Sequence, residues 1–233
     1  MSRLTFVLIP GAGGRAWYWH LVAPELRRRG YDAVAVELPA ADDRAGLPRY
    51  VEAVVEAIGD RTDLVIVAQS LAGFTAPLVC GRVPVRLLVL LNAMIPEPGE
   101  TPGEWWGNTG QAEAKRANDV REGRPPDAEF DLATEFFHDV PQDLFVEALR
   151  HGAPQAEAIF GSRFQLEAWP DVPTRVLVGR DDRFFPADFQ RRVAQERLGI
   201  TPDEMPGGHL VALSRPAELA ERLAAYAADL RGA

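Results

Sequence analysis

The sequence predicts an α/β protein with a mostly parallel sheet of about six strands and with helices on both faces of that sheet. Three observations lead to this prediction. Short apolar runs alternate with helical patterns along most of the 233 residues. The run at residues 4–9 is apolar in the way expected of a strand that is buried on both faces. Hydrophobic residues make up 47% and charged residues 25% of the chain, which is typical of a globular protein.

Local patterns define the elements of the N-terminal part. Glycines separate the first strand from an amphipathic stretch at residues 17–29, and Gly30 ends that predicted helix. Valine and isoleucine at spacings of three and four predict a helix at residues 47–58. The helix predicted at residues 71–79 contains Pro77, which removes a hydrogen bond or causes a kink. In chain order we expect strand 4–9, helix 17–29, strand 33–38, helix 47–58, strand 64–68, helix 71–79 and strand 86–91.

The alternation stops between Ile95 and Trp169. This segment opens with the sequence IPEPGETPGEWW and otherwise has a helical pattern, so we expect a helical cap inserted after the fourth strand. The cap is predicted at residues 96–169, and residues 1–95 and 170–233 form the core. The core is expected to resume with strand 175–178, helix 187–197, strand 200–205 and helix 217–230. Aromatic residues in the cap either pack it onto the core or line a pocket with apolar walls: Trp105, Trp106, Phe130, Phe136, Phe137, Phe145, Phe160 and Phe164.

Charge and residue usage exclude several classes of protein. With 25 basic and 34 acidic residues the net charge is −9, so neither nucleic acid nor a membrane surface is an expected partner. No apolar run approaches the ~20 residues of a membrane span, and the N-terminus lacks the features of a signal peptide, so we expect a cytoplasmic protein. Cys80 is the only cysteine, which excludes disulfides within the chain. Lys115 is the only lysine, a bias that indicates a GC-rich, bacterial genome.

The strongest candidate for a nucleophile is Ser70, in the sequence VIVAQSLAGF. A strand, a small residue, x-Ser-x, a small residue and a helix form the pattern of a nucleophile elbow, whose strained turn exposes the hydroxyl at the end of a sheet. The small residues here are Ala68 and Ala72, where glycine is usual, and Gly73 follows them. The alternative is that Ser70 is an ordinary helix N-cap.

A serine nucleophile needs a base, and the base needs a carboxylate that orients it. Asp181 and Asp182 follow the fifth predicted strand, at the edge where open α/β sheets form their sites. His209 lies on a glycine-flanked loop before the final helix. The chain order Ser, Asp, His predicts Ser70, Asp182 and His209 as the catalytic set. The remaining histidines are assigned to a helix or to the surface of the cap: His20, His138 and His151.

The loop after the first strand, PGAGGRAWYW, supports two interpretations. In a hydrolase, the N–H groups of Ala12 and Leu71 would form the oxyanion hole, because the loop glycines let the backbone approach the substrate. In a dinucleotide-binding oxidoreductase, the match to G-x-G-x-x-A from Gly11, with Glu37 ending the next strand, would bind a pyrophosphate. The second interpretation leaves the catalytic set unexplained and puts the bulky Trp17 near the pyrophosphate.

Taken together, these residues resemble the α/β-hydrolase superfamily across essentially the whole chain, which implies the α/β-hydrolase fold. Within it, the chain is similar to the small methylesterase and hydroxynitrile lyase group of plants and its bacterial relatives. The residues that carry the resemblance are Gly11-Ala12, Ala16-Trp17-Tyr18-Trp19-His20, Ser70, Asp182-Arg183, Pro186, Phe189-Gln190 and Gly208-His209. The chain departs from the family at Pro10, where histidine is usual, and at the two elbow alanines. The lyases have threonine at Gly11 and lysine at Arg183, so the resemblance favours ester hydrolysis over cyanohydrin cleavage.

We therefore expect a serine hydrolase that cleaves a small ester, thioester or lactone with an apolar or aromatic part, through an acyl-enzyme on Ser70. The expected pocket residues are Gly11, Trp105, Trp106, Phe136 and Arg183. This reaction needs no metal or organic cofactor. The only expected partner is the small-molecule substrate, and a homodimer is compatible with the sequence. The alternatives are a ligand-binding or sensor protein with little turnover, and a lyase or carbon–carbon cleaving enzyme that uses the same triad.

Overall fold

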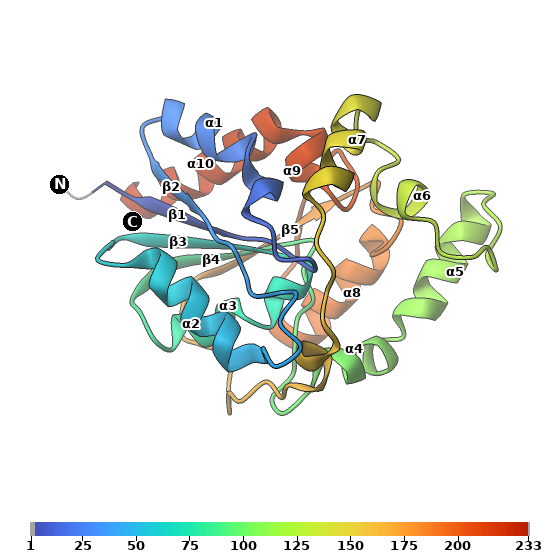
Figure 1. The fold of residues 1–233 in the computed structure, drawn as a ribbon, viewed down its shortest axis with the longest axis horizontal. Helices are drawn as coiled ribbons and strands as arrows, with labels where there is room; N and C mark the ends of the chain where they lie inside the picture. Colours follow the sequence, from blue (N-terminus) through green and yellow to red (C-terminus); the bar gives the residue numbers. More distant parts are fainter. Residues whose placement is uncertain (1–2, 233) are drawn as a thin grey trace.

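The computed structural model describes residues 3–232, which form a six-stranded sheet between layers of helices (Figure 1). All neighbouring strands are parallel, in the order β2-β1-β3-β4-β5-β6. The strands are β1 (Thr5–Ile9), β2 (Asp32–Ala35), β3 (Leu64–Gln69), β4 (Val85–Leu91), β5 (Thr174–Gly179) and β6 (Asp203–Met205). The predicted parallel sheet is confirmed, and its strand order brings the carboxyl ends of β3, β4 and β5 next to one another.

Alternate side chains of the strands β1, β3, β4 and β5 enter one of two separate hydrophobic cores. Val7 and Ile66 point into the first core, whereas Phe6 and Val65 point into the second. Helices α2 (Leu47–Ile58), α3 (Ala76–Cys80) and α8 (Ala187–Leu198) cover the first core, and α1 (Val22–Arg28), α9 (Val211–Ser214) and α10 (Pro216–Gly232) cover the second. In Figure 1, α1 and α10 lie on one side of the sheet and α2 and α3 on the other. Within the described residues, no helix has the length and hydrophobicity needed to cross a bilayer.

The helix predicted at residues 71–79 is two short helices in the structure. A 3-10 helix, η2 (Ser70–Gly73), follows β3 directly, and α3 begins at Ala76. Pro77 lies in the first turn of α3, where its missing N–H has no intrahelical acceptor to satisfy. The proline therefore starts a helix rather than kinking one.

Three other elements differ in extent from the prediction because loop contacts replace regular pairing. The stretch at 17–29 divides into η1 (Ala16–Trp19) and α1. Strand β2 ends at Ala35, because Leu38 donates its N–H to the Gly14 carbonyl of the glycine loop (2.8 Å). Strand β6 begins only at Asp203, since Ile200 still donates to the last turn of α8.

Between β4 and β5 the chain forms a predominantly helical segment, residues 92–173. It contains α4 (Pro102–Thr109), α5 (Gln111–Arg121), α6 (Leu132–Phe136), α7 (Gln142–His151) and η3 (Glu157–Gly161). Figure 1 shows α5, α6 and α7 beyond the edge of the sheet that faces away from the N-terminus. In contrast, α4 is part of the core, because the fully buried Trp105 donates its indole N–H to the Ile95 carbonyl (3.0 Å).

The only lysine of the chain ties α5 to α6. Lys115 Nζ lies 2.8 Å from a carboxylate oxygen of both Asp119 and Glu135, and Arg124 makes a second bond to Asp119 (2.8 Å). Burial by itself would raise the pKa of Asp119, but the hydrogen bonds from Lys115 and Arg124 outweigh it and hold that pKa below its ordinary value. The network therefore fixes the helix that carries Phe136.

Candidate active site

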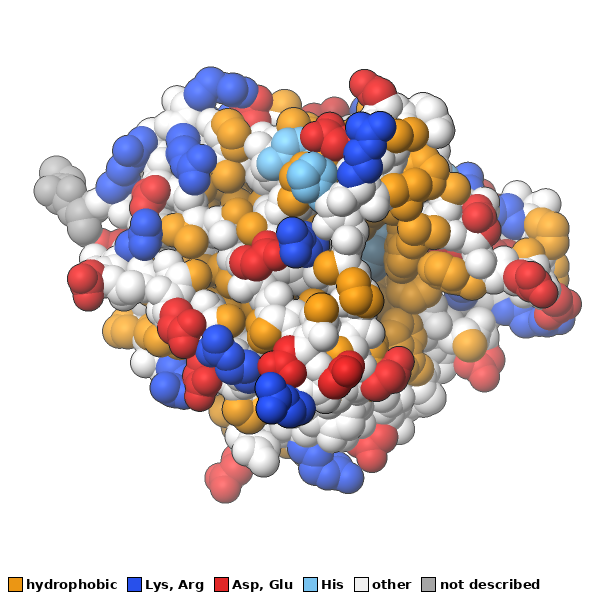
Figure 2. Space-filling model, in the orientation of Figure 1, with side chains coloured by type: hydrophobic (Ala, Val, Ile, Leu, Met, Phe, Trp, Pro, Cys, Tyr) orange, Lys and Arg blue, Asp and Glu red, His pale blue; other side chains and the backbone are white. Residues whose placement is uncertain are grey.

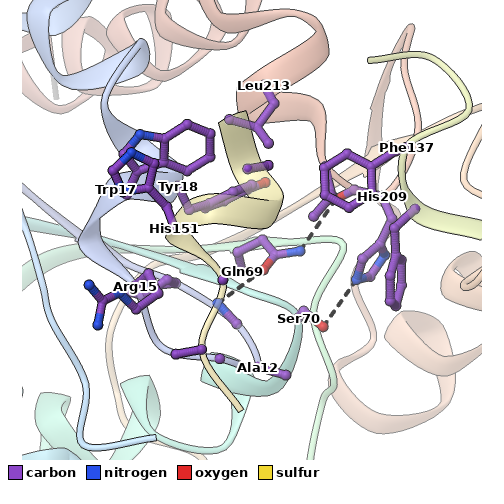
Figure 3. Close-up of a pocket in the computed structure, with 18 of the residues that line it drawn as sticks. Ala12, Arg15, Trp17, Tyr18, Gln69, Ser70, Phe137, His151, His209 and Leu213 are labelled. Atoms are coloured by element: carbon purple, nitrogen blue, oxygen red, sulfur yellow. Dashed lines mark hydrogen bonds between the residues drawn. The ribbon is translucent and has the colours of Figure 1, made fainter. Parts of the chain in front are cut away.

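Ser70 has the strained backbone that a nucleophile elbow requires. It follows the last residue of β3 with φ +52°, in the left-handed region that non-glycine residues rarely adopt. Its carbonyl accepts the N–H of Met94 (3.0 Å), which holds the turn against the loop after β4. The hydroxyl points away from the sheet, toward His209 (Figure 3).

The position that demands glycine in this elbow is Gly73. Ala68 and Ala72 are both buried and fit as alanines. A Cβ on Gly73 would lie 1.8 Å from the Met94 carbonyl oxygen, which is backbone and cannot rotate away. The elbow therefore tolerates alanine at the two usual glycine positions and requires glycine one residue later.

We expect Gly73→Ala to lower the free energy of unfolding by about 3 kcal/mol or more, because the chain after β4 must move to make room. Gly107→Ala is the matched control, since nothing lies within 4 Å of a Cβ at that position of α4. Alanine there should be neutral or stabilising by up to about 1 kcal/mol. Urea denaturation of both variants measures the difference. Equal stabilities would show that the contact with Met94 is easily relieved.

Ser70, His209 and Asp182 form a continuous hydrogen-bonded chain. His209 Nε2 lies 3.1 Å from Ser70 Oγ, and His209 Nδ1 lies 2.8 Å from Asp182 Oδ2. Asp182 and His209 are each only 2% exposed, whereas Ser70 is 8% exposed at the floor of a cavity. The fold thus brings together three residues that are far apart in the sequence, at the ends of β3, β5 and β6.

The second carboxylate oxygen of Asp182 is also fully engaged. Oδ1 accepts the backbone N–H groups of Phe184 (2.9 Å) and Phe185 (2.8 Å), which determines which oxygen faces His209. Aromatic rings surround the imidazole, with Phe136, Phe184 and Phe185 at centroid distances of 4.9, 5.5 and 5.0 Å. The histidine is therefore held on one side by a carboxylate and shielded elsewhere by apolar rings.

The two predicted oxyanion donors lie on two different segments next to Ser70. Leu71 is in the first turn of η2, where a helical N–H has no intrahelical acceptor. Ala12 lies on the glycine loop, and Figure 3 places it beside Ser70. Gly11 must be glycine, because a Cβ there would lie 2.3 Å from Gln69 Oε1 and 2.8 Å from Ser70 Cβ. This close approach lets the loop run directly past the serine.

A cavity of about 350 Å³ opens above Ser70 and His209. Figure 2 shows a hollow with largely hydrophobic walls on the side where α6 and α7 lie. Of the predicted pocket residues, Gly11 and Phe136 line this cavity. Its other apolar walls come from the glycine loop, the helical segment and the His209 loop: Trp17, Tyr18, Leu132, Phe137, Ala148, Leu149, Leu210 and Leu213. Burial raises the pKa of Tyr18 well above its ordinary value, and the nearby Asp182 and Asp139 add to this effect, so its phenol remains neutral.

Trp105, Trp106 and Arg183 do not line the cavity, although the sequence predicted them as pocket residues. Trp105 is fully buried against Phe185, and Trp106 contacts Trp105 edge-on, so both rings pack α4 onto the core. The Arg183 guanidinium donates to the Thr134 carbonyl (3.1 Å) and lines a separate polar hollow behind Asp182. Sequence reasoning could not separate the aromatic residues of the core from those of the pocket, because the same residue types occur in both places.

Two histidines have closer contacts with the site than expected. His151 lines the cavity and stacks on Trp17 at 4.8 Å, while His20 stacks on the same indole at 4.3 Å. His138 has a buried Nε2 next to Gly208, and burial together with Arg183 lowers its pKa. Neither His138 nor His151 takes part in the hydrogen bonds that join Ser70, His209 and Asp182. Both help to form the surroundings of the site.

Sequence reasoning assigned no role in the site to three buried amides behind it: Gln69, Asn92 and Gln190. Gln69 is the last residue of β3 and Asn92 directly follows β4, at the same edge of the sheet as Ser70. Polar residues directly after apolar strands were the available signal, because a buried polar group is costly unless it has hydrogen-bond partners.

The sheet order and the Ser–His–Asp arrangement are those of an alpha/beta hydrolase, and sequence comparison agrees. The profile described as "Alpha/beta hydrolase family" matches residues 6–222. The chain belongs to this family, as the resemblance predicted.

Two of the relatives found by sequence carry the names of the subgroup that the sequence resembles. The alpha-hydroxynitrile lyase of Arabidopsis thaliana is 25% identical, over 96% of this chain and 97% of that protein. Methylesterase 8 of the same plant is 23% identical, over 97% of this chain and 90% of that protein. Among solved structures, polyneuridine aldehyde esterase has a TM-score of 0.77 at 20% identity and covers 97% of this chain and 100% of its own. A pyrethroid hydrolase from Sphingobium faniae has a TM-score of 0.75 at 21% identity and covers 97% and 98%.

Proposed function

We propose that the protein is a serine hydrolase that cleaves a small carboxylic ester, thioester or lactone with an apolar or aromatic part. The observation that carries this proposal is the hydrogen-bonded chain from Ser70 through His209 to Asp182, which ends at the floor of an apolar cavity. A carboxylate, an imidazole and a hydroxyl in this order are the groups needed to activate a serine. The methylesterase and esterase names among the relatives support the same chemistry.

In the proposed mechanism, Ser70 Oγ attacks the carbonyl carbon while His209 Nε2 takes its proton. The tetrahedral oxyanion would accept hydrogen bonds from the N–H groups of Ala12 and Leu71. His209 then protonates the leaving alcohol, and Asp182 stabilises the imidazolium without itself taking the proton. Water, activated by the same histidine, hydrolyses the acyl-enzyme and restores the serine.

The cavity favours a neutral substrate. Its cationic side chain, Arg15, already pairs with Glu37 (3.0 Å), and most of its other lining groups are apolar. At the mouth, Leu132 and Leu149 are 38% and 53% exposed, so an apolar group that extends from the cavity would still be covered on one side. A volume of about 350 Å³ suits a small ester rather than a triglyceride.

Hydrolysis is favoured over cyanohydrin cleavage by the geometry at Gly11. The lyases of the resembling group have threonine at this position, and here a Cβ would collide with Gln69 and Ser70. Arg183, at the position of the lyase lysine, lines a hollow behind Asp182 and not the cavity. The site therefore lacks both side chains that distinguish the lyases.

A panel of p-nitrophenyl esters of increasing acyl length tests the proposal. We expect a rapid burst of one p-nitrophenolate per chain, followed by slower turnover, because the good leaving group makes acylation faster than hydrolysis of the acyl-enzyme. The ratio kcat/KM should rise with acyl length until the chain fills the cavity and then fall. Binding without a burst would favour a sensor protein, and release of cyanide from an aromatic cyanohydrin without ester turnover would favour a lyase.

A further inference from the structure

Three buried carboxamides form a continuous hydrogen-bonded chain behind Ser70, His209 and Asp182. Gln69, Asn92 and Gln190 are 3%, 0% and 4% exposed. They come from the ends of β3 and β4 and from α8, so they reach the site from three different elements.

Gln69 joins the glycine loop to the histidine loop. Its Oε1 accepts the N–H of Gly11 (3.0 Å), and its Nε2 donates to the carbonyl of His209 (3.3 Å). Figure 3 shows Gln69 between these two loops, directly beside Ser70. One side chain thus spans the loop that carries a proposed oxyanion donor and the loop that carries the proposed base.

Asn92 holds the histidine loop from the other side. Its Nδ2 donates to the carbonyls of Gly208 (3.0 Å) and His209 (3.1 Å), and its Oδ1 accepts the N–H of Gly179 at the end of β5 (2.7 Å). The His209 carbonyl therefore accepts hydrogen bonds from two side-chain amides, one at the last residue of β3 and one at the residue after β4. Asn92 adopts φ +44°, a conformation that asparagine tolerates better than most residues.

Gln190 extends the chain to the acid. Its Nε2 donates to the Phe185 carbonyl (2.7 Å) and also approaches Asn92 Oδ1 and Asp182 Oδ2, both at 3.4 Å. The amides consequently link the backbone of every loop that carries a member of the proposed catalytic machinery.

We propose that Gln69 and Asn92 are positioning residues that set the distance between the His209 imidazole and Ser70 Oγ. This inference rests on the proposed serine hydrolase function. A histidine on a glycine-flanked loop has no regular secondary structure to hold it, so its backbone position depends on these side-chain donors. Carboxamides suit the task because they donate and accept at once and carry no charge, whereas a buried charge next to the base would change its protonation.

The variants that test this inference remove the hydrogen bonds without adding backbone strain. Gln69→Met keeps the length of the side chain, and Asn92→Gly keeps the positive φ accessible. We expect each to lower kcat about 10–100-fold with KM changed less than about twofold, because a misplaced base raises the barrier to reaction and leaves binding intact. The double variant should lose more than the product of the two single effects, since the His209 carbonyl then has neither donor.

Thr109→Val is the control for a purely structural loss. Thr109 Oγ1 donates to the Trp105 carbonyl (2.7 Å) in α4, buried but away from the cavity. This variant should lower the thermal midpoint without changing kcat per active site, with active sites counted by burst amplitude. If Gln69→Met and Asn92→Gly behave in the same way, the inference is overturned.

Asn92→Asp gives a signature that loss of stability cannot produce. A carboxylate keeps the bond from Gly179 but faces the carbonyls of Gly208 and His209 with a negative charge. That charge favours the imidazolium, so the acid limb of kcat/KM should move to higher pH. An acid limb that stays in place would contradict the placement of Asn92 next to the base.

A readout that does not need turnover separates this inference from the proposed function. The proton shared by His209 Nδ1 and Asp182 should give a low-field NMR signal, assigned by its loss in His209→Ala. We expect the signal to broaden or shift in Gln69→Met and Asn92→Gly but not in Thr109→Val. If the wild-type protein shows no ester hydrolysis, the proposed function fails, while an unchanged signal in both amide variants still overturns the positioning role.

Discussion

Ser70→Ala is expected to lower kcat roughly 10⁴–10⁶-fold, with the remaining activity due to the oxyanion donors and to substrate binding. The loss should be this large because the serine oxygen is the atom that forms the acyl-enzyme, and among residues 3–232 no other hydroxyl is hydrogen-bonded to His209 Nε2. Single-turnover kinetics with a p-nitrophenyl ester measures the effect. A fluorophosphonate probe should label the wild type and not the variant.

Ser70→Gly provides the matched comparison for stability. Glycine adopts φ +52° without the strain that a Cβ causes there, so it should be more stable than the alanine variant by about 1 kcal/mol. Both variants should be equally inactive. Fluorophosphonate labelling that survives in either variant would show that another residue is the nucleophile.

The second large effect is expected for Asp182→Asn, which should lower kcat about 10⁴-fold. The backbone N–H groups of Phe184 and Phe185 require an oxygen at the Oδ1 position, so they orient the new amide with its NH₂ group toward His209. An NH₂ donor at 2.8 Å from Nδ1 favours the imidazole tautomer that carries its proton on Nε2. That nitrogen then cannot accept the proton of Ser70. Steady-state kinetics measures the loss.

Asp181→Asn is the control for the adjacent acid. Asp181 is exposed, and its Oδ2 accepts the N–H of Gly207 (2.8 Å), two residues before His209. An asparagine oxygen can accept the same bond, so kcat should change less than about threefold. If Asp181→Asn proves the more damaging of the two substitutions, the assignment of the acid is displaced by one residue.

The parallel sheet was predictable because its strands are buried on both faces. Residues 64–69 are apolar up to Gln69, since their alternate side chains enter two different cores, and this leaves a run of valine and isoleucine in the sequence. The helix Leu47–Ile58 was predicted with its observed bounds for the related reason that only one of its faces is buried. The ends of β2 and β6 were less predictable, because they depend on bonds to the glycine loop and to α8.

The order Ser, Asp, His along the chain and the small residues around Ser70 were sufficient to select the three residues that the fold joins by hydrogen bonds. Each of these signals is local: a residue type at the end of a predicted strand, with its immediate neighbours. The pocket had no such local signal. Phe136 lines the cavity while Trp105 is buried in the core, although both lie in the same aromatic segment.

The sequence by itself determined the class of fold, the elements that end at the site and the identity of the candidate nucleophile, base and acid. These could be predicted because the periodicity of apolar residues and the spacing of motif residues are local properties of the chain. The tertiary structure alone decided which aromatic rings form the cavity, that Gly73 rather than Ala72 must be small, and that Gln69 and Asn92 both reach the His209 carbonyl. These features depend on contacts between residues far apart in the sequence, such as Gln69 and His209, which are 140 positions apart. Such contacts exist only once the strand order is established, and a periodicity within a single element carries no information about them.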